Sequence, residues 1–521
     1  MNRVALHRLS RLERRTVSAA NAAVITVFAV ALGVYVMTLL PGSSFGDWGE
    51  MQLIPAQLGV AHPTGYPLYV LLGKAFSLLP IGSVAYRADL LSAFVAAGAA
   101  GGAVLISIRW GVRPLIAAMA GLTLAVTGTL WLEATFSEMN GLHVFLVALV
   151  IHRALVWRAE RRDTDLRLGG LLAGLSVANH LLAVTVVPIV IVFVLVDARA
   201  RLLQRPVVLA QAALLFLAGI ALYAYIPLRA LAGPAAVYGP LLTWDGLSSL
   251  ITGAQFRSAM HFGSGESLSV AWRAVPDVIA QIQEHSNVVF LVGGLAGGAI
   301  LFRRDRWAAA MLSAVALVNV YFFANYVGNL DHYLLVTWLV MAIWLSITGQ
   351  AIVDRIEQRP WARVDLAQVL LLLLPLFIAV SNWPTHDQSA NRVGDDFSAR
   401  IFEALPQDAV LITYWDALTN LSYAHCIEGQ RPDLSLRAYD GTARVSCDPI
   451  TGSIGDVAKT RPVFALFAFE QDLDRLRGTF DLLPGPMLEL PYGDRDLDHS
   501  GILYQLRPKG VRGSAGPATR S

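Results

Sequence analysis

Residues Ala19–Leu40 read AANAAVITVFAVALGVYVMTLL and contain no charged side chain. A helix of about 20 apolar residues crosses the hydrocarbon core of a bilayer, so this run predicts a membrane-spanning helix. It is too long for the apolar core of a signal peptide, and no small-residue cleavage site clearly follows it. We therefore expect a first span that is retained in the protein.

The composition of the chain extends this prediction to most of its length. Of the 521 residues, 55% are hydrophobic and 15% are charged, against about 25% charged in soluble domains. A single soluble globule and a disordered chain are both excluded, and a net charge of +2 gives no reason to expect a nucleic-acid partner. Further apolar runs predict spans at Arg87–Ile108, Leu115–Leu132, Met139–Trp157, Leu168–Asn179, Leu182–Val196, Pro206–Ile226, Val288–Phe302, Trp307–Tyr326, His332–Ile347 and Ala367–Val380. The fold class is a polytopic α-helical membrane protein with about eleven spans.

The arginines set the expected orientation. They gather before the first span and in alternate connections: Arg3 to Arg15, Arg109 and Arg113, Arg153 to Arg167, Arg199 to Arg205, Arg303 to Arg306, and Arg355 to Arg363. Basic connections stay in the cytoplasm, so we expect the N-terminus inside, the C-terminus outside, and a location in the plasma (inner) membrane. This alternation requires two helices meeting at Asn179–His180, because a single tilted helix there would invert it.

Three segments then face the exterior: Pro41–Tyr86, Pro227–Asn287, and everything after about Ser381. We divide the chain into a membrane domain (1–380), a small extracytoplasmic α/β domain (381–510) and a disordered tail (511–521). Buried strands are expected at Ala409–Tyr414, Leu434–Tyr439, Val463–Phe469 and Ile502–Leu506, and helices at Leu418–Glu428 and Gln471–Arg477.

The only two cysteines, Cys426 and Cys447, both lie in the small domain. They could form one disulfide if that domain faces an oxidising compartment, and they are two free thiols otherwise.

The first outer segment holds the candidate chemistry. Asp47 and Glu50 are three residues apart and share a face on one helical turn. The neighbouring Gly46 and Gly49 would let a ligand approach the backbone. The alternative is a solvated acidic pair at a helix N-terminus, which the helix dipole favours. His62 begins a turn rich in proline and glycine and is either a site residue or a turn-stabilising one.

Other polar residues fall in the first outer segment, at the Asn179–His180 break in an apolar stretch, or at expected outer span ends. Each could be structural alone, but all converge on the membrane face of the acidic pair. The candidates are Tyr66, Glu138, His143, His180, Arg229, Asp331 and Tyr333. Arg229 is either an anion-binding residue or a snorkelling interface arginine, with Arg87 and Lys74 as second choices for the anion. No zinc-type ligand spacing occurs. No cofactor is required, although the acidic pair could hold Mg²⁺ or Mn²⁺.

Several motifs resemble one family. GDWGE (46–50), LGVAHPTGYPLY (58–69) and LLSA (90–93) resemble D-x-G-E, LGVAHPPGYPL and N-LLSA of the transmembrane O-mannosyltransferases, which belong to the glycosyltransferase C (GT-C) superfamily. Further resemblances follow in order: SEMNGLHVF (137–145), GLSVANHLL (174–182), YIPLRALAG (225–233), NLDHYLLV (329–336) and YAHCIEGQRPDL (423–434). The chain departs from the family at Asp89, which replaces an asparagine, and at Asn140 and His143, which replace a tyrosine and an asparagine.

The resemblance implies an inverting membrane glycosyltransferase. It would move a mannose-like sugar from a polyprenyl phosphate to an extracytoplasmic hydroxyl, on protein serine or threonine or on a glycan. It implies Asp47 as the general base, Glu50 as its catalytic partner and Arg229 as the phosphate ligand. The other candidates, His62 among them, would bind substrate. Two alternatives stay open, namely a flippase or transporter of lipid-linked sugar and a non-catalytic membrane scaffold whose outer domain binds a partner.

Overall fold

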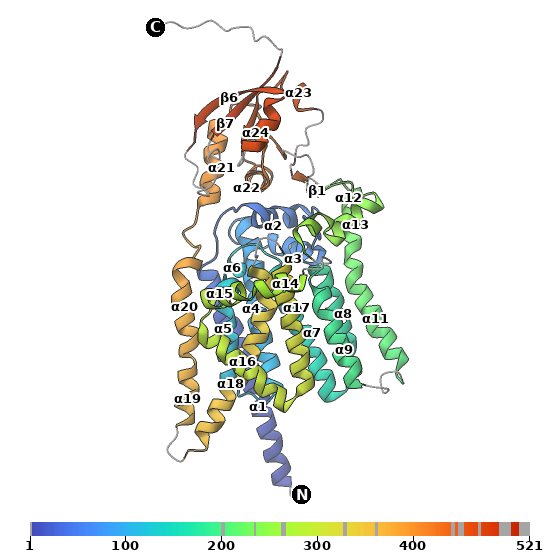
Figure 1. The fold of residues 1–521 in the computed structure, drawn as a ribbon, viewed down its shortest axis with the longest axis vertical. Coiled ribbons are helices and arrows are strands. Elements are labelled where there is room, and N and C mark those ends of the chain that lie inside the picture. The colour runs from blue at the N-terminus through green and yellow to red at the C-terminus, as the bar shows by residue number, and fades with distance from the viewer. Residues whose placement is uncertain are drawn as a thin grey trace.

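The computed structural model describes residues 3–198, 204–233, 236–261, 267–326, 331–359, 363–438, 443–445, 447, 453–466, 470–488 and 502–509. Figure 1 shows a helical bundle with a small sheet domain at one end, while the N-terminal half of α1 projects from the other end. The expected tail, 511–521, lies outside the described residues.

Apolar helices of different lengths form the bundle. They are α1 (Arg3–Met37), α4 (Val84–Ile108), α5 (Pro114–Ala125), α6 (Gly128–Thr135), α7 (Asn140–Glu160), α8 (Asp163–Asn179), α9 (Ala183–Ala198), α11 (Pro206–Ile220), α16 (Val288–Arg304), α17 (Arg306–Asn325), α18 (Leu335–Glu357), α19 (Val364–Leu371) and α20 (Leu373–His386). Within the described residues, seven helical segments are long and apolar enough to cross a membrane, and the bent pair α5–α6 makes an eighth. The bundle is that of a multi-pass membrane protein. Shorter helices of the bundle, such as α8, α9 and α16, lie beside these candidate spans. The number of about eleven membrane spans therefore stays a prediction.

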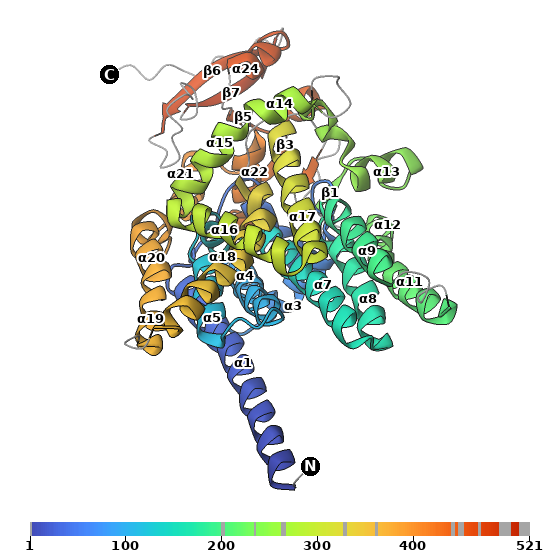
Figure 2. The ribbon, with the colours of Figure 1, turned by 60° about the horizontal axis from the view of Figure 1, so that its bottom comes forward.

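The break at His180 produces two helices, as the charge pattern requires. Helices α8 and α9 lie side by side in Figure 1. A short turn joins them, in which the Leu182 amide donates to His180 Nδ1 at 3.1 Å. At the opposite end of the bundle, Arg158 pairs with Asp197 and Asp305 at 2.9 and 2.6 Å. These ion pairs join the last turns of α7 and α9 to the residue that precedes α17. In Figure 2, α1 extends well beyond the other helices of the bundle.

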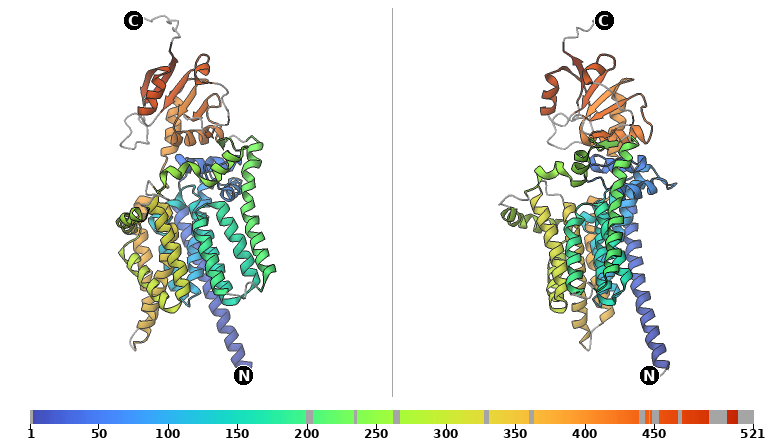
Figure 3. Two further views of the ribbon diagram at one scale, coloured as in Figure 1. Left: turned by 45° about the vertical axis from the view of Figure 1, so that its right-hand side comes forward. Right: turned by 90° about the vertical axis from the view of Figure 1, so that its right-hand side faces the viewer.

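A layer of short elements covers the end of the bundle nearest the sheet domain (Figure 3). It consists of α2 (Gly46–Gln57), α3 (Pro67–Ser77), the 3₁₀ turn η1 (Ala221–Ala224), α12 (Tyr225–Leu231), β1 (Ala236–Tyr238), α13 (Trp244–Thr252), η2 (Ala254–Ala259), α14 (Ser267–Arg273), α15 (Val275–His285) and η3 (Asp331–Leu334). These elements come from the outer segments and span ends expected from the sequence.

The C-terminal domain is built on one sheet. Its strand order is β3-β2-β5-β7-β6, with β2 parallel to β3 and β5, and β7 antiparallel to β5 and β6. The strands are β2 (Val410–Thr413), β3 (Ser435–Ala438), β5 (Val463–Leu466), β6 (Phe480–Met487) and β7 (Ile502–Pro508), and the helices are α21 (Val393–Ala404), α22 (Trp415–Cys426), α23 (Ile454–Val457) and α24 (Glu470–Arg477). Each expected strand therefore has a counterpart, although residues 467–469 lie outside the described part.

A disulfide joins Cys426 to Cys447. Cys426 is the last residue of α22, and Cys447 follows β4 (Ala443–Val445). Strand β4 pairs antiparallel with β1, so the C-terminal domain and the second outer segment share a two-stranded ribbon.

Candidate active site

The acidic pair lies on the first turns of α2, in the layer between the bundle and the sheet domain. The two carboxylates have different surroundings, since Glu50 is completely buried and the side chain of Asp47 is 53% exposed. A fully buried carboxylate needs partners to remain charged. Asp47 is thus the carboxylate that an incoming molecule can reach.

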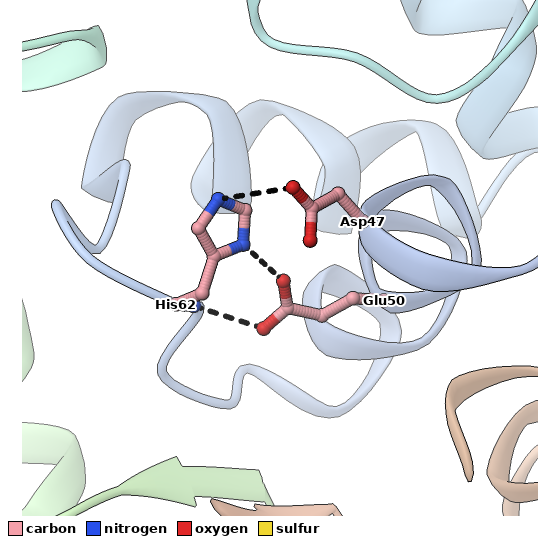
Figure 4. Close-up of side chains that lie close together, drawn as sticks. All are labelled: Asp47, Glu50 and His62. Atoms are coloured by element: carbon pink, nitrogen blue, oxygen red, sulfur yellow. Dashed lines mark hydrogen bonds and ion pairs between the residues drawn. The ribbon is translucent and has the colours of Figure 1, made fainter. Parts of the chain in front are cut away.

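His62 lies between the two carboxylates (Figure 4). Its backbone amide donates to Glu50 Oε1 at 2.9 Å, and its imidazole Nδ1 bonds to Glu50 Oε2. The other ring nitrogen, Nε2, lies 3.8 Å from Asp47 Oδ2. The imidazole therefore links the buried carboxylate to the accessible one.

The charge state of His62 follows from these neighbours. Burial lowers the pKa of His62, but the charges of Asp47 and Glu50 and the hydrogen bond with Glu50 outweigh it and raise the pKa to about 9. His62 is therefore an imidazolium at neutral pH, where it partly neutralises the acidic pair.

A row of rings continues from His62 toward the bundle. The hydroxyl of Tyr66 lies 3.1 Å from His62 Nε2, and the Tyr66 and His180 rings are 5.4 Å apart between centroids. The His180 and His143 ring centroids are 5.4 Å apart, and the two buried ring nitrogens of His143 have no hydrogen-bond partner among the described residues. Burial, then the charge of Asp47, raises the pKa of Tyr66 well above its ordinary range, so its hydroxyl stays protonated.

A second pair of carboxylates, the buried Glu133 and Glu138, lies near Asp47 and Glu50. Asn140 Nδ2 donates to Glu133 Oε2 at 3.0 Å and to Glu138 Oε2 at 3.3 Å, and His332 Nδ1 lies 3.6 Å from Glu133 Oε1. Burial and then the charges of Glu133 and Asp47 raise the pKa of Glu138 well above its usual value. Glu138 was expected from the sequence. Glu133 was missed because it directly follows the predicted span Leu115–Leu132 and belongs to none of the motifs.

The remaining predicted residues surround this core at different distances. The Tyr333 ring packs against His332 and Tyr326, with centroids 4.5 and 5.0 Å apart, and Asp331 begins the same 3₁₀ turn, η3. Arg229 lies on α12 and donates through Nε to the carbonyl of Leu58 at 2.7 Å. The guanidinium thus attaches α12 to the end of α2.

The second-choice cations bind backbone carbonyls. Lys74 Nζ donates to the carbonyl of Ala56 at 2.6 Å, and Arg87 donates to the carbonyls of Leu79 and Ser83 at 2.7 and 3.0 Å. These contacts stabilise the first outer segment locally.

The two glycines beside the acidic pair make room for the C-terminal domain, which differs from our expectation of a ligand. Gly46 has φ +57°, and a Cβ there would lie 2.7 Å from Asp416 Oδ1. A Cβ on Gly49 would lie 2.4 Å from the carbonyl of Ser44 and 3.0 Å from Thr419 Oγ1. Both glycines therefore permit the close approach of α22 to α2.

Two aromatic residues that sequence reasoning missed complete the site. Trp415, the first residue of α22, donates its indole N–H to Asp47 Oδ1 at 3.2 Å. Tyr238, at the end of β1, packs against Trp415 with ring centroids 5.5 Å apart. Burial and then the charge of Glu50 raise the pKa of Tyr238 well above its ordinary range. Both residues reach the site through tertiary contacts between distant segments.

Asp47, Glu50 and His62 could also hold a metal ion. Each offers one ligand atom, and the three atoms lie within 4.8 Å of one another. Such a set suits a divalent cation. Metal binding there would need the His62 imidazole to be deprotonated at the nitrogen that binds the ion.

The architecture is thus a membrane helical bundle with a carboxylate–histidine cluster at one end, beneath a small α/β domain. The structure resembles crystal structures of ArnT from Cupriavidus metallidurans, bound to undecaprenyl phosphate (TM-score 0.60, 14% identity, 93% of this chain and 97% of that one) and in the apo state (TM-score 0.61, 14% identity, 94% and 98%). This likeness is one of fold.

The sequence itself is related to protein O-mannosyl-transferases. The family profile described as the N-terminal domain of protein O-mannosyl-transferase TMEM260 matches residues 47–203. The mouse protein O-mannosyl-transferase TMEM260 is 29% identical over 79% of this chain, and its Dictyostelium discoideum counterpart is 22% identical over 80%. The chain spans 62% and 57% of the length of these two relatives. These matches confirm the resemblance seen in the motifs: the chain is similar in sequence to protein O-mannosyl-transferases and in fold to ArnT.

Proposed function

We propose that this protein is an inverting membrane glycosyltransferase. It transfers a hexose, of the mannose type, from a polyprenyl phosphate to the hydroxyl of an extracytoplasmic protein. The observation that carries the proposal is the accessible Asp47 carboxylate, held beside the His62 imidazolium at the end of the bundle nearest the C-terminal domain. Relatives named as protein O-mannosyl-transferases support the reaction class. The fold shared with a protein crystallised with undecaprenyl phosphate supports a lipid-linked donor.

The step is a direct displacement. The acceptor oxygen bonds to the anomeric carbon of the sugar from the face opposite the phosphate, while the bond between that carbon and the phosphate oxygen breaks. The acceptor proton moves to Asp47, and polyprenyl phosphate leaves with its electron pair. A general base of this kind contributes a factor of about 10² to 10⁴ in rate.

The residues around Asp47 have separate roles in this proposal. Glu50 fixes His62, and the His62 imidazolium stabilises negative charge near the reacting atoms. Tyr66, Glu138, His143 and His180 line the side toward the bundle, where sugar hydroxyls would need hydrogen-bond partners. Asp331 and Tyr333 border the same side, and Arg229 holds the loop that carries His62.

The proposed orientation places this layer and the C-terminal domain, from about residue 381 to 510, on the extracytoplasmic face of the plasma membrane. Its support is the ion-paired arginines at the opposite end of the bundle. A metal such as Mg²⁺ or Mn²⁺ is not needed for the step as written.

The test is transfer from a panel of tritiated polyprenyl-phosphate hexoses to envelope proteins of the source cell, using purified protein in lipid vesicles. We expect one hexose, mannose in the first instance, to enter protein in a base-labile or enzymatically releasable O-linkage. Movement of labelled lipid across the vesicle membrane without any transfer would favour a flippase. The absence of both would favour a scaffold.

A further inference from the structure

We infer that Trp415 positions the catalytic carboxylate of Asp47, so that the C-terminal domain completes the active site of the membrane part. This inference rests on the proposed function. It adds to the site a residue that lies 368 positions away from Asp47 in the sequence.

Helix α22 is fixed on the layer that carries the site. Asn420 Nδ2 donates to Ser43 Oγ at 3.1 Å and to the Ser44 carbonyl at 3.2 Å, and the Ala85 amide donates to the Tyr423 hydroxyl at 2.8 Å. Asn420 is fully buried. Buried hydrogen bonds between two elements define their relative position, so the first turn of α22 is held against α2.

The Asp47 carboxylate is held on both oxygens by different parts of the chain. Oδ1 accepts the Trp415 indole N–H at 3.2 Å, while Oδ2 lies 3.8 Å from His62 Nε2. A half-exposed aspartate without such contacts would sample several rotamers. The indole therefore leaves Oδ2 directed toward His62 and fixes the plane of the carboxylate.

The indole is itself prevented from turning away. The Tyr238 ring packs on it with an interplanar angle of 62°, and Tyr238 ends β1, which pairs with β4. The disulfide from Cys447 returns to Cys426 at the far end of the helix that begins with Trp415. Both ends of α22 are therefore connected to the β1–β4 ribbon. The Tyr238–Trp415 contact connects its first residue to β1, and the disulfide connects its last residue to Cys447, which follows β4.

Orientation of a base acts in the transition state more than in substrate binding. Loss of the indole N–H should therefore lower kcat and leave the KM for the lipid-linked donor unchanged. We expect kcat to fall about tenfold, the effect of losing one hydrogen bond to a charged group.

The experiment compares Trp415→Phe with wild type, using the hexose that the wild type transfers and measuring kcat, donor KM and the thermal unfolding midpoint. Trp272→Phe, at a side chain that is 78% exposed, is the matched control. Because Trp415→Phe could unfold the interface, a second variant carries benzothienylalanine at position 415. This residue keeps the two-ring shape and removes only the N–H.

A fall in kcat with unchanged donor KM and unfolding midpoint, in either variant that folds, supports the inference. Wild-type kcat in the benzothienylalanine variant overturns it, as does a rise in donor KM with kcat unchanged. If the wild type transfers no hexose at all, the proposed function has failed, and that outcome is distinct from a failure at Trp415.

Discussion

Glu50 binds His62 twice. Its Oε1 accepts the backbone amide at 2.9 Å, and its Oε2 bonds to the imidazole Nδ1. Two contacts from one buried carboxylate fix both the position of the loop and the orientation of the ring. Consequently Nε2 faces both the Tyr66 hydroxyl, at 3.1 Å, and the accessible Asp47 carboxylate, at 3.8 Å. This arrangement assigns unequal roles to two acids that look alike in the sequence.

Activity should decline on the alkaline side as His62 loses its proton. The pKa of His62 is raised from 6.5 to about 9. The contribution of the imidazolium to stability is therefore complete below about pH 6.5 and is lost as pH rises through about 9. A pH–rate profile should show an alkaline limb near 9. His62→Asn should remove this limb and lower the plateau, and an unchanged limb in that variant would contradict the assignment.

Glu50→Gln should move the same limb to lower pH. The substitution removes one of the two negative charges that raise the pKa of His62, while an amide oxygen can still accept a hydrogen bond. We expect activity near neutral pH to be retained in part and lost earlier as pH rises. A limb that stays near 9 would show that Glu50 does not govern the charge of His62.

Removal of divalent cations should leave transfer unchanged. Metal binding needs a deprotonated imidazole, whereas His62 is protonated at neutral pH and its Nδ1 is engaged by Glu50. The measurement is the transfer rate after treatment with EDTA and after adding Mg²⁺ or Mn²⁺ back. Loss with the chelator and recovery with either ion would instead place a cation among Asp47, Glu50 and His62.

The glycine at the start of α2 offers a test of the docking between α22 and α2. Gly46→Ala combines a backbone penalty at φ +57° with a Cβ placed 2.7 Å from Asp416 Oδ1. Gly111→Ala is matched, because φ is +74° there and nothing lies within 4 Å of the added Cβ. Gly111→Ala should cost about 1 kcal/mol in stability, with full activity. Gly46→Ala should cost more and reduce kcat, and equal effects of the two on kcat would argue against the docking role.

The sequence predicted the parts of this molecule that local patterns define. Apolar runs located the helices of the bundle, and alternating charge separated α8 from α9. The spacing of Asp47 and Glu50 predicted their shared helical turn. Strands β2, β3, β5 and β7 of the C-terminal domain were likewise recognisable as short apolar runs, whereas β6 (Phe480–Met487) was not predicted.

The remaining features depend on contacts between distant segments. Trp415 and Tyr238 reach Asp47 and Glu50 only after the C-terminal domain docks. Gly46 and Gly49 have the sequence context of a ligand loop, yet the space they leave is taken by α22. Glu133 directly follows a predicted span, and its partners, Asn140 and His332, come from other elements, so its role in the site is visible only in the folded structure.

The most direct test of the central claim compares Asp47→Asn with wild type in two measurements on the same vesicles. One measures binding of the tritiated polyprenyl-phosphate hexose, and the other measures its transfer to protein. The account predicts unchanged donor binding and a loss of transfer of about 10² or more, because the amide cannot take the acceptor proton. Transfer at the wild-type rate by Asp47→Asn would contradict it.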